Sequence, residues 1–124
     1  MPAEVLVVEE TPSLGSSVVA LLESDGLAVR QFLDLPAAES YHAASASSHP
    51  VVVVASNAHY CPSASRWALG TLREAHLVIV GTRDPALRSA GRMHVVHLPL
   101  GPTEFLELLR GLLGAPKSDT PPAA

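Results

Sequence analysis

Two adjacent acidic residues, Glu9 and Glu10, follow directly on the short apolar block of residues 5–8. Carboxylate oxygens are the ligands that Mg²⁺ and other hard cations prefer in proteins. Two acids supply few anionic ligands, however, and successive side chains on an extended backbone point to opposite sides. The pair therefore predicts either a weak Mg²⁺ site or two solvated acids without a metal.

Two hydroxyl side chains stand where two later apolar blocks end. Ser56 follows residues 51–55, and Thr82 follows residues 77–80 and Gly81. A serine hydroxyl is a weak nucleophile unless a neighbouring base activates it, and the sequence shows no such base. We therefore expect Ser56 to serve as a hydrogen-bonding residue and Thr82 to cap the local backbone.

The six histidines and the single cysteine raise the question of a zinc site. His94 and His97 are an odd number of residues apart, so on one strand they face opposite sides. His59 and Cys61 have a suitable loop spacing, but no second pair of ligands accompanies them. A thiol without an evident base is also a poor nucleophile. These residues therefore predict neither a zinc site nor a catalytic cysteine.

The composition describes one small domain with a hydrophobic core. Of 124 residues, 48% are hydrophobic and only 16% are charged, which disfavours disorder and a second domain. A net charge of −4 without clustered Lys or Arg argues against nucleic acid. No apolar run approaches the length of a membrane span. With one cysteine and no basic, apolar leader at the start, we expect a cytoplasmic protein.

Apolar blocks that alternate with helical segments predict how these residues are positioned. The block at residues 51–54 consists of four valines, apolar on both faces, which is typical of a central parallel strand. Such alternation favours a parallel sheet with helices on both faces and right-handed crossovers. We expect strands at 5–8, 27–32, 50–55, 77–80 and 93–97, and helices at 12–25, at 37–46, from 63 to about 74, and in a last segment that ends before 114.

Residues 1–114 thus form the predicted domain, and residues 115–124 a disordered tail or a linker. The last ten residues contain three prolines and no residue suited to a core. The segment 83–92 has room for only a turn or two of helix. In the terminal helix, Leu106 and Leu113 lie off the expected core face, so they extend the core stripe or form a docking surface.

Over about residues 4–114 the chain resembles the receiver domain of two-component response regulators. Four segments carry the resemblance: the acidic pair after the first strand, the third strand that ordinarily ends in the phosphoacceptor Asp, the fourth strand with its hydroxyl switch residue, and the segment of the Lys-Pro pair. In this chain they are residues 7–14, 50–56, 78–82 and 90–100. The resemblance implies an α/β fold of the flavodoxin/CheY-like type: three layers, a doubly wound five-stranded parallel sheet of order 2-1-3-4-5, and here a shortened fourth helix.

The departures from the receiver pattern bear on its chemistry. Ser56 stands where the phosphoacceptor Asp is expected, and Leu98 stands before Pro99 where the Lys is expected. Val95 replaces the aromatic residue of the switch, while Thr82 keeps the hydroxyl. The resemblance therefore implies that acyl-phosphate chemistry and its switching are lost.

We accordingly expect a non-enzymatic pseudo-receiver that acts by phosphorylation-independent protein–protein interaction in bacterial signalling. Its partner would be a signalling or regulatory protein or a second copy of the chain. The expected partner face consists of Val95, His97, Leu106 and Leu113. Two alternatives stay open: phosphorylation of Ser56 as an unconventional acceptor, and a small-ligand sensor that uses the vacated pocket.

Overall fold

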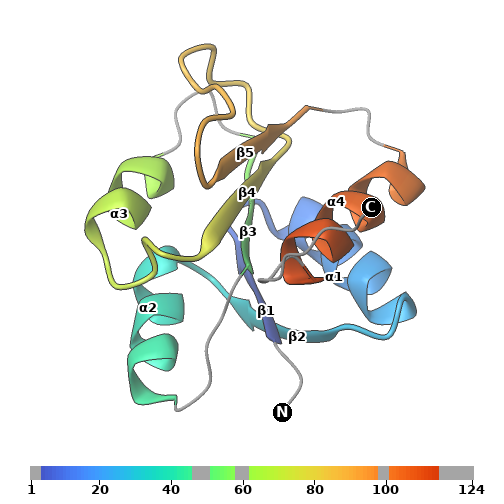
Figure 1. The fold of residues 1–124 in the computed structure, drawn as a ribbon, viewed down its shortest axis with the longest axis horizontal. Coiled ribbons are helices and arrows are strands. Elements are labelled where there is room, and N and C mark those ends of the chain that lie inside the picture. Colours follow the sequence, from blue (N-terminus) through green and yellow to red (C-terminus); the bar gives the residue numbers. More distant parts are fainter. Residues whose placement is uncertain (1–3, 46–50, 58–61, 98–100, 115–124) are drawn as a thin grey trace, which may run out of the picture.

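A computed structural model describes residues 4–45, 51–57, 62–97 and 101–114. Five strands form one parallel sheet of order β2-β1-β3-β4-β5, as the sequence predicts (Figure 1). In chain order the elements are β1 (Glu4–Glu9), α1 (Pro12–Ser24), β2 (Ala28–Phe32), α2 (Leu35–Ala44), β3 (Val51–Ala55), α3 (Ser63–Leu69), β4 (His76–Val80), β5 (Met93–Val96) and α4 (Pro102–Gly114).

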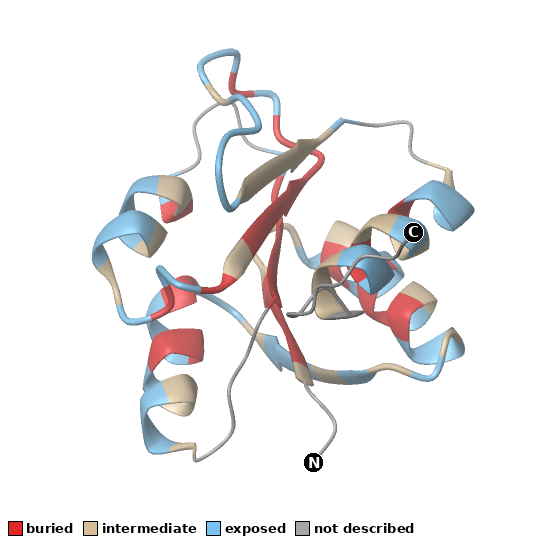
Figure 2. Cartoon of the chain, in the orientation of Figure 1, coloured by how far each residue is buried: buried red, intermediate tan, exposed pale blue. Residues whose placement is uncertain are grey.

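The three central strands are buried on both faces. All five residues of β3 have an exposed fraction of 0%, and in β1 and β4 the four consecutive residues 5–8 and 77–80 are at most 1% exposed. Unbroken Val, Leu and Ile runs are what a parallel strand between two helical layers requires. The edge strands β2 and β5 are only partly buried, and Figure 2 shows this contrast between the centre and the edges of the sheet.

Each face of the sheet has its own helical layer. Val5, Val7 and Val53 pack with α1 and α4, whereas Leu6, Val52 and Val54 pack with α2 and α3. The two pairs of helices lie on opposite sides of the sheet in Figure 1. Side chains that alternate along each strand therefore divide the core into two clusters.

The first two helices follow the sequence signals closely. Pro12 begins α1, where a missing N–H breaks no bond, and Gly26, with φ of 83°, allows the turn after it. The second helix begins two residues before the expected position, because the Asp34 side chain accepts a hydrogen bond from the Ala37 N–H at 2.9 Å.

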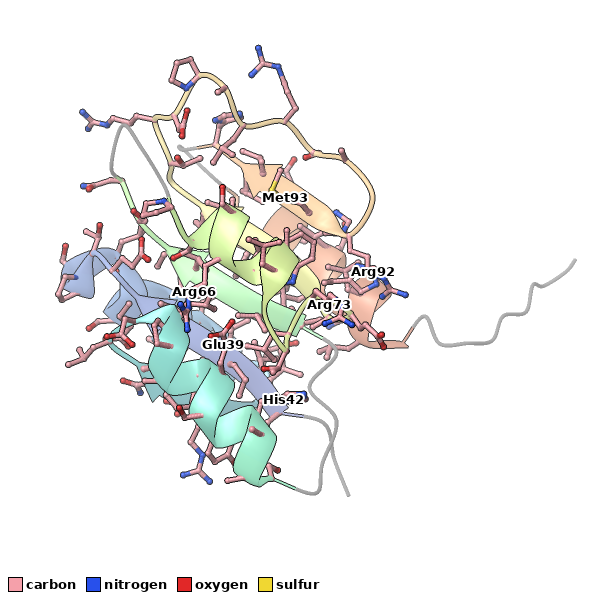
Figure 3. All side chains as sticks on the ribbon, turned by 90° about the vertical axis from the view of Figure 1, so that its left-hand side faces the viewer. Glu39, His42, Arg66, Arg73, Arg92 and Met93 are labelled. Carbon is pink, nitrogen blue, oxygen red and sulfur yellow. The ribbon has the colours of Figure 1, made fainter. Side chains whose placement is uncertain are left out.

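The third helix is shorter than expected, ending at Leu69 instead of near Glu74. A side chain at Gly70 would overlap the Glu39 carboxylate of α2. Arg66 fixes that carboxylate through an ion pair of 2.7 Å, and Figure 3 shows the two facing each other. After the early helix end, Leu72 turns into the core while Leu69 stays 86% exposed.

The helix expected between β4 and β5 does not form. Residues 83–92 form two short turns joined by irregular backbone, and the end of the segment doubles back along the outer edge of β5. Ala90 and Met93 exchange two backbone hydrogen bonds of 2.9 Å across Gly91, whose φ is 58°. Ser89 Oγ accepts from the Val95 N–H at 2.9 Å. The segment thus covers an edge that an exposed strand would leave open to pairing.

The terminal helix turns a broad apolar stripe toward the sheet. Phe105 and Leu109 are fully buried, and Leu106, Leu108, Leu112 and Leu113 are partly buried against the same cluster. Leu106 and Leu113 therefore extend the core stripe. None of the helices in the described ranges has the length and apolar character needed to span a bilayer. The predicted tail 115–124 lies outside the described residues.

Leucine-to-alanine substitutions at a buried and at an exposed position should differ strongly in their effect on the free energy of unfolding. Leu109→Ala should lower the free energy of unfolding by about 2–5 kcal/mol, because it removes buried methyl groups and leaves a cavity. Leu69→Ala removes the same atoms from an exposed position and should change stability by less than about 0.5 kcal/mol. Urea unfolding followed by circular dichroism gives both values. Equal costs at the two positions would contradict the packing described here.

Candidate functional site

The carboxyl ends of the parallel strands meet at one edge of the sheet. In such sheets, ligands and chemistry lie outside this edge. Here the chain leaves β1 at Glu9 and Glu10, β3 at Ser56 and Asn57, β4 at Gly81 and Thr82, and β5 at His97.

The two acidic residues diverge. Glu9 lies against α1, where its side chain fills the space that a Cβ at Gly15 would need. Glu10 lies toward α3 and accepts a short hydrogen bond from the Ser63 hydroxyl. The two carboxylates therefore do not converge on a common cation. Across the described residues, no three His, Cys, Asp or Glu side chains are grouped closely enough to hold a metal ion.

Ser56 and Thr82 are both buried, with exposed fractions of 2% and 4%. The Ser56 N–H donates to the Val80 carbonyl at 3.1 Å, which extends the pairing of β3 and β4 by one residue. Thr82 Oγ1 accepts from the Asp84 N–H at 3.1 Å, so it caps the local backbone. Sequence reasoning missed Asp84, which is buried and accepts from the Ala86 N–H at 3.0 Å. The sequence signal that could have identified Asp84 is the Asp-Pro pair after the fourth strand, which is typical of a turn.

Thr11 joins the ends of β1 and β3. Its Oγ1 accepts from the Asn57 N–H at 3.0 Å and donates to Asn57 Oδ1 at 3.1 Å. Its own N–H donates to the Ala55 carbonyl at 2.9 Å. Thr11 precedes α1, but its side chain makes no cap hydrogen bond to the helix, because it is engaged across the sheet edge instead.

A cleft of about 490 Å³ opens beside the start of α1. Neither Ser56 nor the two glutamates line it, so it lies next to the predicted phosphoacceptor position and not on it. Among the described residues of the lining, polar side chains predominate and Arg83 carries a fixed positive charge. The cleft is lined by Thr11, Ser13, Leu14, Ser17, Asn57, Gly81, Thr82, Arg83 and His97.

The four residues of the expected partner face do not share one face. Val96 packs with the cluster under α1 and α4, so its neighbour Val95 lies on the opposite side of the sheet. Leu106 and Leu113 pack on the α1 and α4 side, and His97 lines the cleft. The sheet therefore separates Val95 from the two leucines. Leu98 and Pro99 lie outside the described residues.

Two histidines that sequence reasoning did not connect lie together at the opposite edge of the sheet. His76 of β4 and His94 of β5 place Nδ1 and Nε2 3.2 Å apart. Burial lowers the pKa of both rings, and the neighbouring His94 and Arg92 lower the pKa of His76 further. The parallel register, which pairs Val78 with His94, brings them to one face.

A comparison with solved structures identifies the fold. No family model and no curated protein sequence matches the chain. The receiver domain of the sensor histidine kinase PA1611 from Pseudomonas aeruginosa aligns with a TM-score of 0.67 and 19% identity, over 93% of this chain and all of that domain. The chain has the fold of a receiver domain. The neighbour holds a magnesium ion in its active-site cleft, and at this identity the likeness establishes the fold alone.

Because Glu9 lies against Gly15 of α1, alanine at position 15 should destabilise the protein, although alanine normally stabilises a helix relative to glycine. Gly15→Ala should lower the free energy of unfolding by about 1–3 kcal/mol, because the new Cβ overlaps the Glu9 side chain. The control is Gly111→Ala in α4, where a Cβ meets no atom within 4 Å and alanine should stabilise by about 0.5–1 kcal/mol. Chemical denaturation measures both. A stabilising Gly15→Ala would show that Glu9 does not lie against α1.

The histidine pair predicts a pH dependence of stability. Because folding lowers both pKa values below 6.5, the unfolded chain binds more protons in the acidic range. The free energy of unfolding is therefore at its full value above pH 6.5 and declines as the pH falls below it. His76→Gln should make this decline shallower, and NMR titration of the ring protons should place both pKa values below 6.5. A ring titrating at or above 6.5 would contradict this account.

Proposed function

We propose that this chain is a receiver-like module for signalling that works through protein–protein contacts and without phosphorylation. One observation carries the proposal: the strand end that would supply the nucleophile of a receiver supplies Ser56, a hydroxyl that is 2% exposed. The receiver fold, found in a sensor histidine kinase of a bacterium, supports a role in bacterial signal transduction. Such a module is not an enzyme.

The chemistry of phosphotransfer requires groups that this edge does not bring together. An attacking oxygen must reach the phosphorus atom, and a cation must balance the charge that develops. Ser56 is enclosed by the sheet edge, and the Glu9 and Glu10 carboxylates point to α1 and α3. Neither carboxylate is positioned to act as a base for the Ser56 hydroxyl.

The signalling surface would also differ from that of a switching receiver. Residues 83–92 cover the β5 edge as turns, held by the Ala90–Met93 pair and by Ser89. Thr82, the hydroxyl expected to switch, is bound to the next turn through the Asp84 N–H. These hydrogen bonds hold the surface of residues 83–92 in one conformation. A partner that recognises a single conformation can bind such a surface. The partner would be a regulatory protein or a second copy of the chain.

Exposure to a phosphodonor separates this proposal from the use of Ser56 as an unconventional acceptor. After incubation with acetyl phosphate and Mg²⁺, intact-mass spectrometry should find the chain unmodified, because Ser56 is buried and a phosphodonor in solution does not reach its hydroxyl. A receiver domain that retains its phosphoacceptor Asp, treated in parallel, serves as the positive control.

A phosphoryl adduct on this chain that disappears in the Ser56→Ala variant would overturn the proposal. An adduct that persists in that variant would place the acceptor elsewhere and would equally contradict phosphorylation-independent action. Measuring both the native chain and Ser56→Ala therefore leaves no outcome undecided.

A further inference from the structure

The histidine pair at the amino-terminal edge of the sheet presents two ring nitrogens to each other. Nδ1 of His76 and Nε2 of His94 lie 3.2 Å apart, and the ring centroids lie 5.3 Å apart. His76 begins β4, and His94 is the second residue of β5. Sequence reasoning compared His94 with His97 of the same segment, whereas the fold pairs it with a histidine 18 residues earlier.

The backbone of the sheet sets the placement of both rings. His76 and Val78 are two residues apart on β4, so their side chains lie on the same face of the sheet. His94 is the register partner of Val78 on β5, and Val78 packs in the cluster under α1 and α4. Both rings therefore lie on that face, and both residues are partly exposed, so a solute can reach the nitrogens.

The distance between the two nitrogens suits a shared metal ion. Zinc binds imidazole nitrogen at about 2.0–2.1 Å, which places two tetrahedral nitrogen ligands about 3.4 Å apart. The observed 3.2 Å is close to that spacing. Burial lowers the pKa of both rings below 6.5, so at neutral pH they carry the lone pairs that a metal requires. A hydrogen-bonded pair of this kind has the spacing of a chelating pair.

We propose that His76 and His94 form a two-histidine site for a divalent transition-metal ion, Zn²⁺. The facing nitrogens of the two rings supply the ligands. The hydrogen that one of them carries in the metal-free pair moves through water to the other nitrogen of the same ring, so both rings stay neutral.

The proposed site holds its metal reversibly. Within the described ranges, no third His, Cys, Asp or Glu joins the pair in a group that could hold a metal. Water therefore occupies the remaining positions around the ion, and the ion exchanges with solution. The inference goes beyond the proposed function, because contact with a protein partner requires no metal.

This site differs in place and in chemistry from the magnesium site of a receiver. The receiver resemblance puts Mg²⁺ at the carboxyl-terminal edge of the sheet, where oxygen ligands hold a hard cation. The histidine pair lies at the opposite edge and offers nitrogen ligands, which suit Zn²⁺. The acetyl phosphate experiment reads Ser56, so it and the metal test can each fail while the other succeeds.

Arg92 gives the proposal a second, independent consequence. It begins the approach to β5, where Figure 3 labels it, and it lies close enough to His76 to lower the pKa of that ring. The same positive charge opposes a bound cation. Arg92→Gln should therefore tighten Zn²⁺ binding about two- to fivefold, whereas an anion held by these residues would bind less tightly in that variant.

The test is an NMR titration of the imidazole rings in the whole chain, without an affinity tag and near neutral pH. Zinc chloride is added to about 1 mM, a concentration that reveals even a weak site. The His76 and His94 ring signals should both shift saturably, and a chelator should reverse the shifts. Magnesium chloride is the matched probe and should leave both rings unchanged, because Mg²⁺ prefers oxygen ligands.

Histidine variants separate the pair from general binding to histidine. His76→Gln and His94→Gln should each weaken Zn²⁺ binding at least about tenfold, since even residues that only support metal ligands contribute this much to affinity. His42→Gln is the control, because it removes the same side chain from α2 on the other face of the sheet. Its affinity should stay within about twofold of the native chain. All three histidines are partly exposed, so the amide spectra should show folded variants.

Four results would overturn the proposal. They are an absence of saturable shifts in the two rings, shifts confined to other histidines, an equal loss of affinity in His42→Gln, and weaker Zn²⁺ binding in Arg92→Gln.

Discussion

Burial of the central strands on both faces is the constraint on which the rest of this molecule depends. Val52 and Val53, neighbours on β3, belong to different core clusters, so both helical layers are needed to bury the two faces of the strand. The parallel direction follows, because helical crossovers are what cover both faces of such a sheet. All strands then end at one edge, and the polar residues that follow them are gathered there.

The same alternation decides what that edge can do. Successive side chains point to opposite faces of the sheet, and this holds for the two adjacent acids at the end of β1. Glu9 therefore contacts α1 and Glu10 contacts α3. Between them the edge is closed by hydrogen bonds of Thr11 to Asn57 and of Ser56 to Val80. An edge of this kind keeps the architecture of a receiver while its acids are separated and its donors line a cleft beside α1.

The strands were predictable because their signal is local, whereas their order came from the resemblance to receiver domains. A run such as residues 51–55, apolar at every position, fits a doubly covered strand and little else of that length. The early end of α3 was missed although Gly70 is a helix-end signal in the sequence; the contact with the Glu39 carboxylate that requires glycine there is a tertiary feature. The hairpin of residues 90–93 likewise depends on the free edge of β5, a tertiary feature without a sequence period.

The site residues also fall into two groups: some follow a local sequence signal, and others are brought together only by the fold. Ser56 and Thr82 were found because they follow apolar runs, and the structure places them just beyond the ends of β3 and β4. The lining of the cleft beside α1 was not predictable, because it joins residues from four separate strand ends. His76 and His94 were missed for a similar reason, since only the register between β4 and β5 brings them together.

The central claim is that the receiver fold persists here without the receiver's phosphorylation chemistry. Beryllofluoride, a phosphate mimic that needs Mg²⁺ to bind a receiver, tests this directly at the Ser56 amide by ¹H–¹⁵N NMR. The account predicts no saturable shift of Ser56 that requires Mg²⁺ and beryllofluoride together. A saturable shift of Ser56 that appears only when both are present would contradict it.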